Sequence, residues 1–171
     1  VLVANMPLCD DVIRTYAQLK YIDVAFTGVD HIGLEAAKEK KVTVANAAGY
    51  SNEAVAELAV GGVLESLRYL PQVEDNCRKS KTKENYIGNE IKGKTVGIIG
   101  LGKIGMRSAE LFHAFQATIL ANKKHPSEVP SWNTLTSKQE IYQKADIIVL
   151  HCPLNEETRG MIGHAQLTQM K

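Results

Sequence analysis

The sequence predicts an α/β protein in which a Rossmann-type, doubly wound parallel sheet is joined to part of a second, smaller α/β domain. Short β-rich runs alternate with helix-like runs along most of the chain, which is typical of parallel sheets. A G-x-G-x-x-G pattern at Gly100, Gly102 and Gly105 follows an apolar run and opens a helix-like run. A long helix pattern and a polar stretch interrupt the alternation once, which indicates two domains.

The first 50 residues predict a compact strand and helix series. Residues 1–5 form a β-rich run, and residues 10–19 form a helix pattern that opens with acidic residues, as helix N-termini prefer. Residues 21–28 predict a second buried strand, residues 33–41 a short helix and residues 42–47 a third strand. We expect these elements to form part of one parallel sheet.

A long helix is predicted from Ser51, where the hydroxyl can cap and apolar residues then recur at helical spacing as far as Leu70. After Pro71 the polar, basic stretch 77–94 predicts a helix end and an exposed crossing segment. The boundary between the domains therefore falls between residues 49 and 94. We assign residues 1–50 to one domain and residues 51–171 to the other.

A second strand and helix series begins at residue 95. Residues 95–100, 103–115 and 117–122 predict one strand, helix and strand unit. Ser137 and Glu140 have the spacing of a capping box and open a helix that reaches Lys144. Residues 146–153 predict a further strand.

The bulk composition excludes several classes of protein. With a net charge of only +1, no global electrostatic field attracts the chain to nucleic acid or to anionic lipid. Three widely spaced cysteines favour reduced thiols in the cytoplasm over a disulfide framework or a zinc site. The apolar runs are shorter than the roughly 20 residues of a membrane span. The chain opens within a predicted strand that has no initiator Met, so we expect missing upstream residues.

The glycine pattern predicts a dinucleotide site. Gly100 permits a tight turn, Gly102 lets the backbone approach a pyrophosphate, and Gly105 lets helix and strand pack closely. With Lys103 and Ile104 between the last two glycines, the helix N-terminus would offer N–H groups and a positive dipole to the anion. The alternative is a glycine-rich turn that binds nothing.

The end of the next predicted strand bears on cofactor choice. An NAD-preferring site normally has Asp or Glu about 20 residues after the first glycine, whereas this sequence has Asn122, Lys123 and Lys124. Two ammonium groups suit a 2′-phosphate, so the residues favour NADP over NAD. The alternative is that both lysines belong to a solvated strand end.

Three segments together resemble the D-isomer-specific 2-hydroxyacid dehydrogenase family, which includes phosphoglycerate dehydrogenase and glyoxylate or hydroxypyruvate reductases. They are FTGVDHIGLEAAKEKKVTVANAAGYSNEAVAELAV, GNEIKGKTVGIIGLGKIG and ADIIVLHCPLNEETRGMIG. The resemblance implies an NAD(P)-binding Rossmann domain and a flavodoxin-like substrate domain. It also implies oxidation of the CH–OH group of a D-2-hydroxy acid, or reduction of a 2-keto acid.

The resemblance assigns two loops. Thr27, Gly28 and Val29 match a loop whose backbone N–H groups bind the substrate carboxylate, although a simple tight turn explains them equally. The matches to the family's cofactor loop are His151, Cys152, Pro153 and Thr158. His151 would face the cofactor crevice at a strand end, or merely cap that strand.

The family's catalytic Arg, Glu and His lie in segments that follow the motif ending here in LTQMK. We therefore assign no catalytic residue and expect a fragment, truncated at its C-terminal end, that is inactive alone. The complete protein is expected to be an active homodimer. Two alternatives are a non-enzymatic, cofactor-sensing protein of the corepressor type and a different Rossmann enzyme such as a hydrolase that uses bound NAD.

Overall fold

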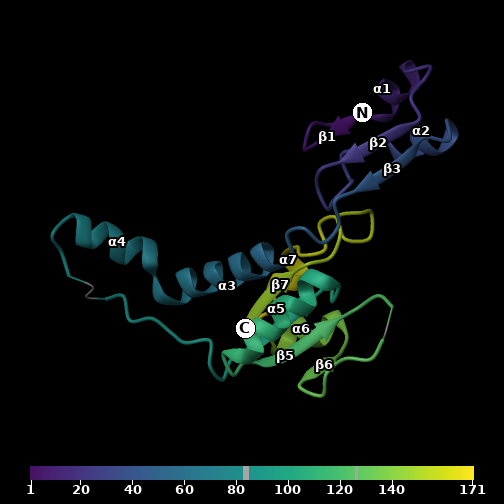
Figure 1. The fold of residues 1–171 in the computed structure, drawn as a ribbon. Helices are drawn as coiled ribbons and strands as arrows, with labels where there is room; N and C mark the ends of the chain where they lie inside the picture. The colour runs from purple at the N-terminus through teal and green to yellow at the C-terminus, as the bar shows by residue number, and fades with distance from the viewer. Residues whose placement is uncertain (83–84, 126) are drawn as a thin grey trace. The chain divides into compact units, whose positions relative to one another are not determined.

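The computed structural model describes residues 1–82, 85–125 and 127–171 (Figure 1). They form two compact units, one of Val1–Ser51 with Pro153–Arg159 and the other of Asn52–Cys152 with Gly160–Lys171. Both units contain parallel strands and helices, so the predicted α/β class is confirmed. Residues 153–159 group with the first unit, whereas the sequence placed them in the second domain. Residues 83–84 of the predicted crossing segment lie outside the described residues.

The first unit contains a three-stranded parallel sheet with the order β1-β2-β3. The strands are β1 (Leu2–Val3), β2 (Tyr21–Val24) and β3 (Thr43–Asn46), and the helices are α1 (Asp10–Thr15) and α2 (Leu34–Glu39). Strands β1 and β2 and helices α1 and α2 supply buried apolar side chains to its core, and Val44 of β3 packs against them. The buried side chains include Val3, Ile13, Ile22, Val24, Ala36 and Ala37.

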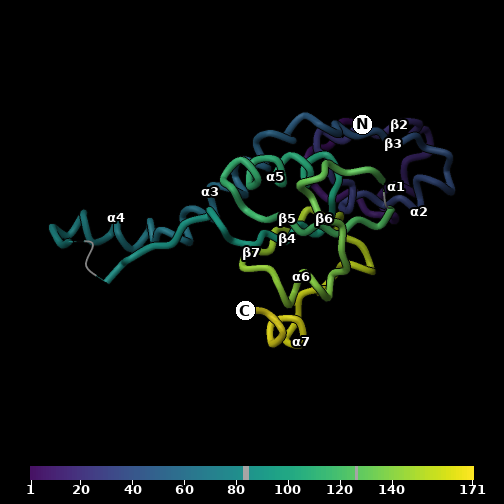
Figure 2. The backbone as a smooth tube through the Cα atoms, turned by 90° about the horizontal axis from the view of Figure 1, so that it is seen from below, coloured from purple at the N-terminus to yellow at the C-terminus, as the bar shows by residue number. Residues whose placement is uncertain are grey.

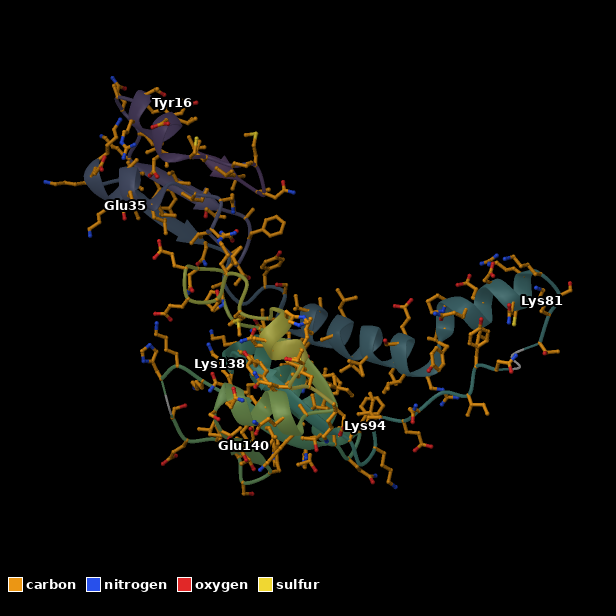
Figure 3. The ribbon with its side chains drawn as sticks, turned by 180° about the vertical axis from the view of Figure 1, so that it is seen from behind. Tyr16, Glu35, Lys81, Lys94, Lys138 and Glu140 are labelled. Atoms are coloured by element: carbon orange, nitrogen blue, oxygen red, sulfur yellow. The ribbon has the colours of Figure 1, made fainter. Side chains whose placement is uncertain are left out.

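Several predicted elements of the first unit are too long. The predicted helix 10–19 ends at Thr15 because Tyr16 takes an extended backbone conformation, with φ −81° and ψ 98°. The Tyr16 side chain is half exposed (Figure 3), so no burial holds another helical turn there. The predicted strand 21–28 ends at Val24, before the loop that contains Thr27.

The second unit contains a four-stranded parallel sheet with the order β6-β5-β4-β7. Its strands are β4 (Thr95–Ile99), β5 (Thr118–Asn122), β6 (Asn133–Leu135) and β7 (Ile147–Leu150). In sequence order this is the 3-2-1-4 arrangement of a Rossmann sheet, and the strand order reverses between β4 and β7. A ligand crevice is expected at the carboxyl ends of these two strands.

Helices cover both faces of this sheet, which makes it doubly wound. Figure 2 shows α5 (Lys103–Ala114) on one side of the strands and α6 (Lys138–Lys144) on the other. Alternate β4 residues face the two layers, because Val96 and Ile98 pack with Ala109 and Phe112 of α5 whereas Ile99 packs with Ile141 of α6. Helix α3 (Asn52–Arg68) packs against α5.

The long predicted helix is in fact two helices. It breaks at Tyr69, whose backbone is left-handed at φ 53°, and resumes as α4 (Leu70–Arg78). Pro71 occupies the first turn of α4, where the missing N–H has no helical partner to lose. Helix α4 ends at Arg78, within the stretch 77–94 where a helix end was predicted. No helix in the described part of the chain is long and apolar enough to cross a membrane.

Two short elements were not predicted from the sequence, β6 and the helix α7 (His164–Leu167). Strand β6 has only three residues, too few to show a clear alternation. The predicted cap of α6 is confirmed, since the Ser137 hydroxyl accepts from the Glu140 N–H at 3.1 Å. The Glu140 carboxylate does not complete the capping box but contacts Thr136 and Lys144.

Asp146 ties the first residue of β4 to the start of β7. Its carboxylate accepts from the Thr95 N–H at 2.8 Å and from the Lys171 ammonium at 3.0 Å. The Thr95 N–H and then Lys171 lower the pKa of Asp146. A carboxylate with a lowered pKa stabilises the fold above its unfolded pKa, and this stability is lost as the pH falls through the folded pKa.

We expect Asp146→Asn to destabilise the second unit by about 1 kcal/mol at pH 7, because a charge-assisted bond becomes neutral at a partly exposed position. The difference from the wild type should shrink toward pH 2, because protonation of Asp146 removes the charge that Asn also lacks. Urea denaturation at both pH values tests this. Asp75→Asn, which breaks an exposed pair with Lys79, is the control and should change stability by less than about 0.5 kcal/mol. An equal loss for Asp146→Asn at pH 2 would contradict the assignment.

Candidate functional site

The turn after β4 can accommodate only glycine at its first position. Gly100 has φ 100°, a left-handed backbone that other residues rarely adopt. Its N–H donates to the Asn122 carbonyl at 3.0 Å, which continues the pairing of β4 with β5. A Cβ on Gly100 would lie 2.4 Å from the Cys152 nitrogen, so a side chain would also strike the backbone after β7.

The other two glycines of the motif differ in what they require. A Cβ on Gly105 would lie 2.1 Å from the Gly100 carbonyl oxygen, so Gly105 is needed for α5 to pack on the turn. A Cβ on Gly102 would meet no described atom within 4 Å. Gly102 is also the N-cap of α5, with no side-chain cap for the first-turn N–H groups. This end of α5 therefore suits an anion that approaches the backbone closely.

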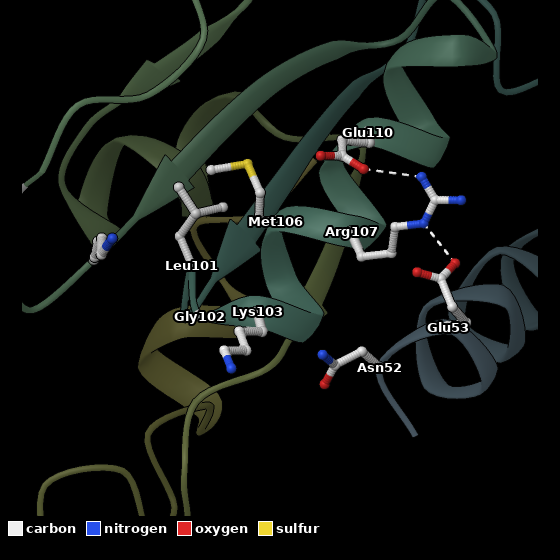
Figure 4. Close-up of a pocket in the computed structure, with 9 residues that line it drawn as sticks. Asn52, Glu53, Leu101, Gly102, Lys103, Met106, Arg107 and Glu110 are labelled. Carbon is white, nitrogen blue, oxygen red and sulfur yellow. Dashed lines mark hydrogen bonds and ion pairs between the residues drawn. The ribbon is translucent and has the colours of Figure 1, made fainter. Parts of the chain in front are cut away.

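A cleft of about 580 Å³ lies beside the same turn (Figure 4). Its described lining residues come from α3, α5, the glycine turn and the end of β5: Asn52, Glu53, Leu101, Gly102, Lys103, Met106, Arg107, Glu110 and Lys123. Arg107 lies between Glu110 and Glu53, at 2.9 and 2.7 Å, and these two carboxylates raise the pKa of Arg107. Its charge is matched locally.

The residues predicted at the end of β5 have different surroundings. The Asn122 amide donates to the Thr136 carbonyl at 2.9 Å, which fixes that side chain. The Lys123 ammonium donates to the Ser127 hydroxyl, a neutral partner, at 2.6 Å. Lys123 is among the described residues that line the cleft, whereas the exposed Lys124 is not.

His151 follows β7 and is held beside the glycine turn. Its N–H donates to the Ile99 carbonyl at 2.8 Å, so it lies next to the carboxyl end of β4. Its Nε2 lies 2.8 Å from the hydroxyl of Ser108 on α5. Burial lowers the pKa of His151, which favours the neutral ring.

The remaining predicted cofactor residues fall into both units. Cys152 is half buried, and its sulfur lies 3.6 Å from that of Met161. Pro153 and Thr158 belong to the first unit, where the Thr158 hydroxyl donates to the Pro153 carbonyl at 2.6 Å. The same hydroxyl accepts from the Asn155 N–H at 2.9 Å, so Thr158 organises its own loop.

The loop with Thr27, Gly28 and Val29 lies between β2 and α2 in the first unit. Asn46 of β3 donates from its amide to the Thr27 carbonyl at 2.7 Å and holds the loop on the sheet. The Thr27 hydroxyl oxygen is buried and has no hydrogen-bond partner among the described residues. Its place after a parallel strand suits a binding loop, and its geometry is also that of a tight turn.

Sequence reasoning missed several residues of the site. Glu53, Arg107 and Glu110 were not singled out, although Arg107 and Glu110 have the i, i+3 spacing of a helical ion pair. Ser108 was also missed. Its position three residues after Gly105 places it on the same side of α5, which was the available signal.

The chain matches the family model described as "D-isomer specific 2-hydroxyacid dehydrogenase, NAD binding domain" over residues 60–171. The chain belongs to this family. The match includes the whole glycine turn, Lys123, Ser108 and His151. The resemblance in the sequence is thus confirmed, and the second unit is the part that carries the family's NAD-binding domain.

The chain is similar to curated relatives along most of its own length. It is 37% identical to D-3-phosphoglycerate dehydrogenase of Methanocaldococcus jannaschii, covering 94% of this chain and 32% of that protein. It is 34% identical to hydroxypyruvate reductase of Thermotoga maritima, covering 94% and 53%. The chain therefore spans between a third and about half of these relatives.

Solved structures of the family resemble the chain closely. An acyclic imino acid reductase in complex with NADPH and D-Arg has a TM-score of 0.93 at 31% identity, covering 99% of this chain and 56% of that one. D-lactate dehydrogenase from Aquifex aeolicus, complexed with NAD and lactic acid, has a TM-score of 0.92 at 29% identity, covering 99% and 53%. Both kinds of nicotinamide cofactor thus occur among similar proteins.

The crowded Gly105 and the open Gly102 predict losses of different size on alanine substitution. Gly105→Ala should destabilise the second unit by more than about 2 kcal/mol, because the new methyl group strikes a backbone carbonyl. Gly102→Ala should cost about 1 kcal/mol or less, because the new methyl group meets no described atom and only the preference for Gly over Ala at an N-cap is lost. Thermal and urea denaturation of both variants measure this. Equal losses would show that the turn does not have the described packing.

Proposed function

We propose that the chain binds a nicotinamide dinucleotide at the α5 turn and that the complete protein is a dehydrogenase of D-2-hydroxy acids. Gly102 carries the proposal, because packing explains the other two motif glycines, whereas the open space beside Gly102 at the N-terminus of α5 suits a ligand that approaches the backbone. The uncapped N-terminus of α5 supports the same ligand, since its N–H groups and dipole suit a pyrophosphate.

The surrounding residues fit the two halves of such a cofactor. The pyrophosphate would rest on the backbone from Gly102 to Gly105, with Lys103 and Ile104 in the first helical turn. The adenosine would extend toward Lys123 at the end of β5, and the nicotinamide toward His151 and Cys152 after β7, across the point where the strand order reverses. Pro153 and Thr158 form the loop that follows.

When bound, the nicotinamide supplies the hydride that such a reaction exchanges with the substrate carbon. We propose that the first unit is part of the substrate domain and that the N–H groups of Thr27, Gly28 and Val29 bind the substrate carboxylate. Three of the proteins above support this class of substrate, because by name they are a phosphoglycerate dehydrogenase, a hydroxypyruvate reductase and a lactate dehydrogenase.

We further propose that NADP binds tighter than NAD. Lys123 lines the cleft, and its ammonium donates to the neutral Ser127 hydroxyl. Lys103 lines the same cleft, so a 2′-phosphate there would meet two cationic side chains. Lys124 follows directly in the sequence and is exposed.

The preference for NADP should be about tenfold, equivalent to about 1.4 kcal/mol, and should shrink as salt is raised because the contact is ionic and exposed. Lys123→Asp should reverse the order, since a carboxylate accepts from the ribose hydroxyls and repels the phosphate. Fluorescence titrations with both cofactors at low and high salt measure this. Lys92→Asp, an equal charge change at an exposed position before β4, is the control. Equal affinities that neither salt nor Lys123→Asp alters would identify the lysines as a solvated strand end.

A polypeptide of these 171 residues should bind the cofactor without reducing any 2-keto acid, because the reaction needs a cation for the carboxylate and a proton donor near neutral pH. We assign neither the cation nor the proton donor to a residue of this chain. Absorbance at 340 nm with glyoxylate, hydroxypyruvate and pyruvate tests it, and turnover above a cofactor-only blank would refute it. The complete protein should turn over at least one such acid. Cofactor binding without any turnover by the complete protein would favour the non-enzymatic alternative.

A further inference from the structure

Ser108 and His151 form a contact that none of the proposed binding steps uses. Ser108 lies in the middle of α5 and is fully buried, with an exposed fraction of 0%. Its hydroxyl has one hydrogen-bond partner among the described residues, the Nε2 atom of His151 at 2.8 Å. The two residues are 43 positions apart in sequence, so only the tertiary fold brings them together.

The burial of Ser108 decides the direction of this hydrogen bond. A serine hydroxyl has one proton to donate, and a buried donor without an acceptor costs about 1–3 kcal/mol. A buried oxygen that leaves a lone pair unused is tolerated better. The Ser108 O–H therefore donates, and Nε2 of His151 accepts.

This direction fixes the tautomer of the histidine. A neutral imidazole has one protonated and one unprotonated nitrogen, so an accepting Nε2 places the proton on Nδ1. Burial keeps the ring in its neutral form by lowering the pKa of His151. In the described part of the chain Nδ1 has no hydrogen-bond partner, and the ring is half buried. The Nδ1–H group is then a donor without an acceptor among the described residues.

We propose that Ser108 is a positioning residue, which locks the His151 ring so that Nδ1–H donates to the nicotinamide half of a bound dinucleotide. The inference rests on the proposed function. The position of the ring supports it, because His151 is hydrogen-bonded through its backbone to Ile99, directly before the glycine turn. It also follows β7, on the far side of the switch point from the adenosine strand β5. The acceptor there would be a ribose hydroxyl or the carboxamide oxygen.

The test for the ring uses the chain without cofactor. In the wild type, ¹⁵N–¹H correlation spectra of the His151 ring at pH 8 should show a protonated Nδ1 and an unprotonated Nε2. Ser108→Ala removes the donor to Nε2, so the Nε2–H tautomer should gain population. Ser108→Thr keeps the hydroxyl and should retain the wild-type pattern. Ser66→Ala, an exposed serine on α3, is the matched control.

The test for the ligand is titration of the same variants with NADH and NADPH. Ser108→Ala should raise both dissociation constants about three- to tenfold, as expected for one lost hydrogen bond, and Ser66→Ala should change neither. An unchanged tautomer in Ser108→Ala overturns the positioning role. A changed tautomer with unchanged dissociation constants overturns the role toward the dinucleotide. A wild type that binds neither cofactor overturns the proposed function, whereas the spectra still decide whether Ser108 sets the tautomer.

Discussion

The carbonyl oxygen of Gly100 is the point on which the second unit depends. Gly105 in the first turn of α5 lies so close to this oxygen that a methyl group on Gly105 would overlap it. This approach brings the N-terminus of α5 to the carboxyl end of β4, and the same turn continues the pairing with β5 through the Gly100 N–H. One backbone contact thus sets the sheet, the helix and the entrance of the crevice together.

The charge around this turn follows from the same placement. The helix N-terminus is positive, and the nearby cleft adds Lys103 and Lys123. Arg107 would add a third cation, but Glu53 and Glu110 hold it in ion pairs on one side of the cleft. The excess positive charge is therefore confined to the turn and the end of β5, where phosphate groups of a dinucleotide would lie. The net charge of the chain, +1, gives no sign of this local field.

The Ser108 and His151 contact shows how the two sides of the crevice are joined. The histidine comes from the strand beyond the switch point and the serine from the helix that follows the glycine turn. A buried, directional bond between them orients a ring that would otherwise rotate between solvent and the helix. Binding groups on rigid elements are more precise than groups on loops. By contrast, Thr158 uses its hydroxyl to order its own loop.

The sequence by itself determined the parallel α/β class, the glycine turn, its neighbouring lysines and the cap at Ser137, because these depend on residues close together in the chain. It also indicated the family, which the match over residues 60–171 confirmed. The tertiary structure decided the break at Tyr69, the grouping of residues 153–159 with the first unit, the ion pairs of Arg107 and the partner of Ser108. Each of these depends on contacts between distant residues or on burial, and local patterns carry no information about which distant groups meet.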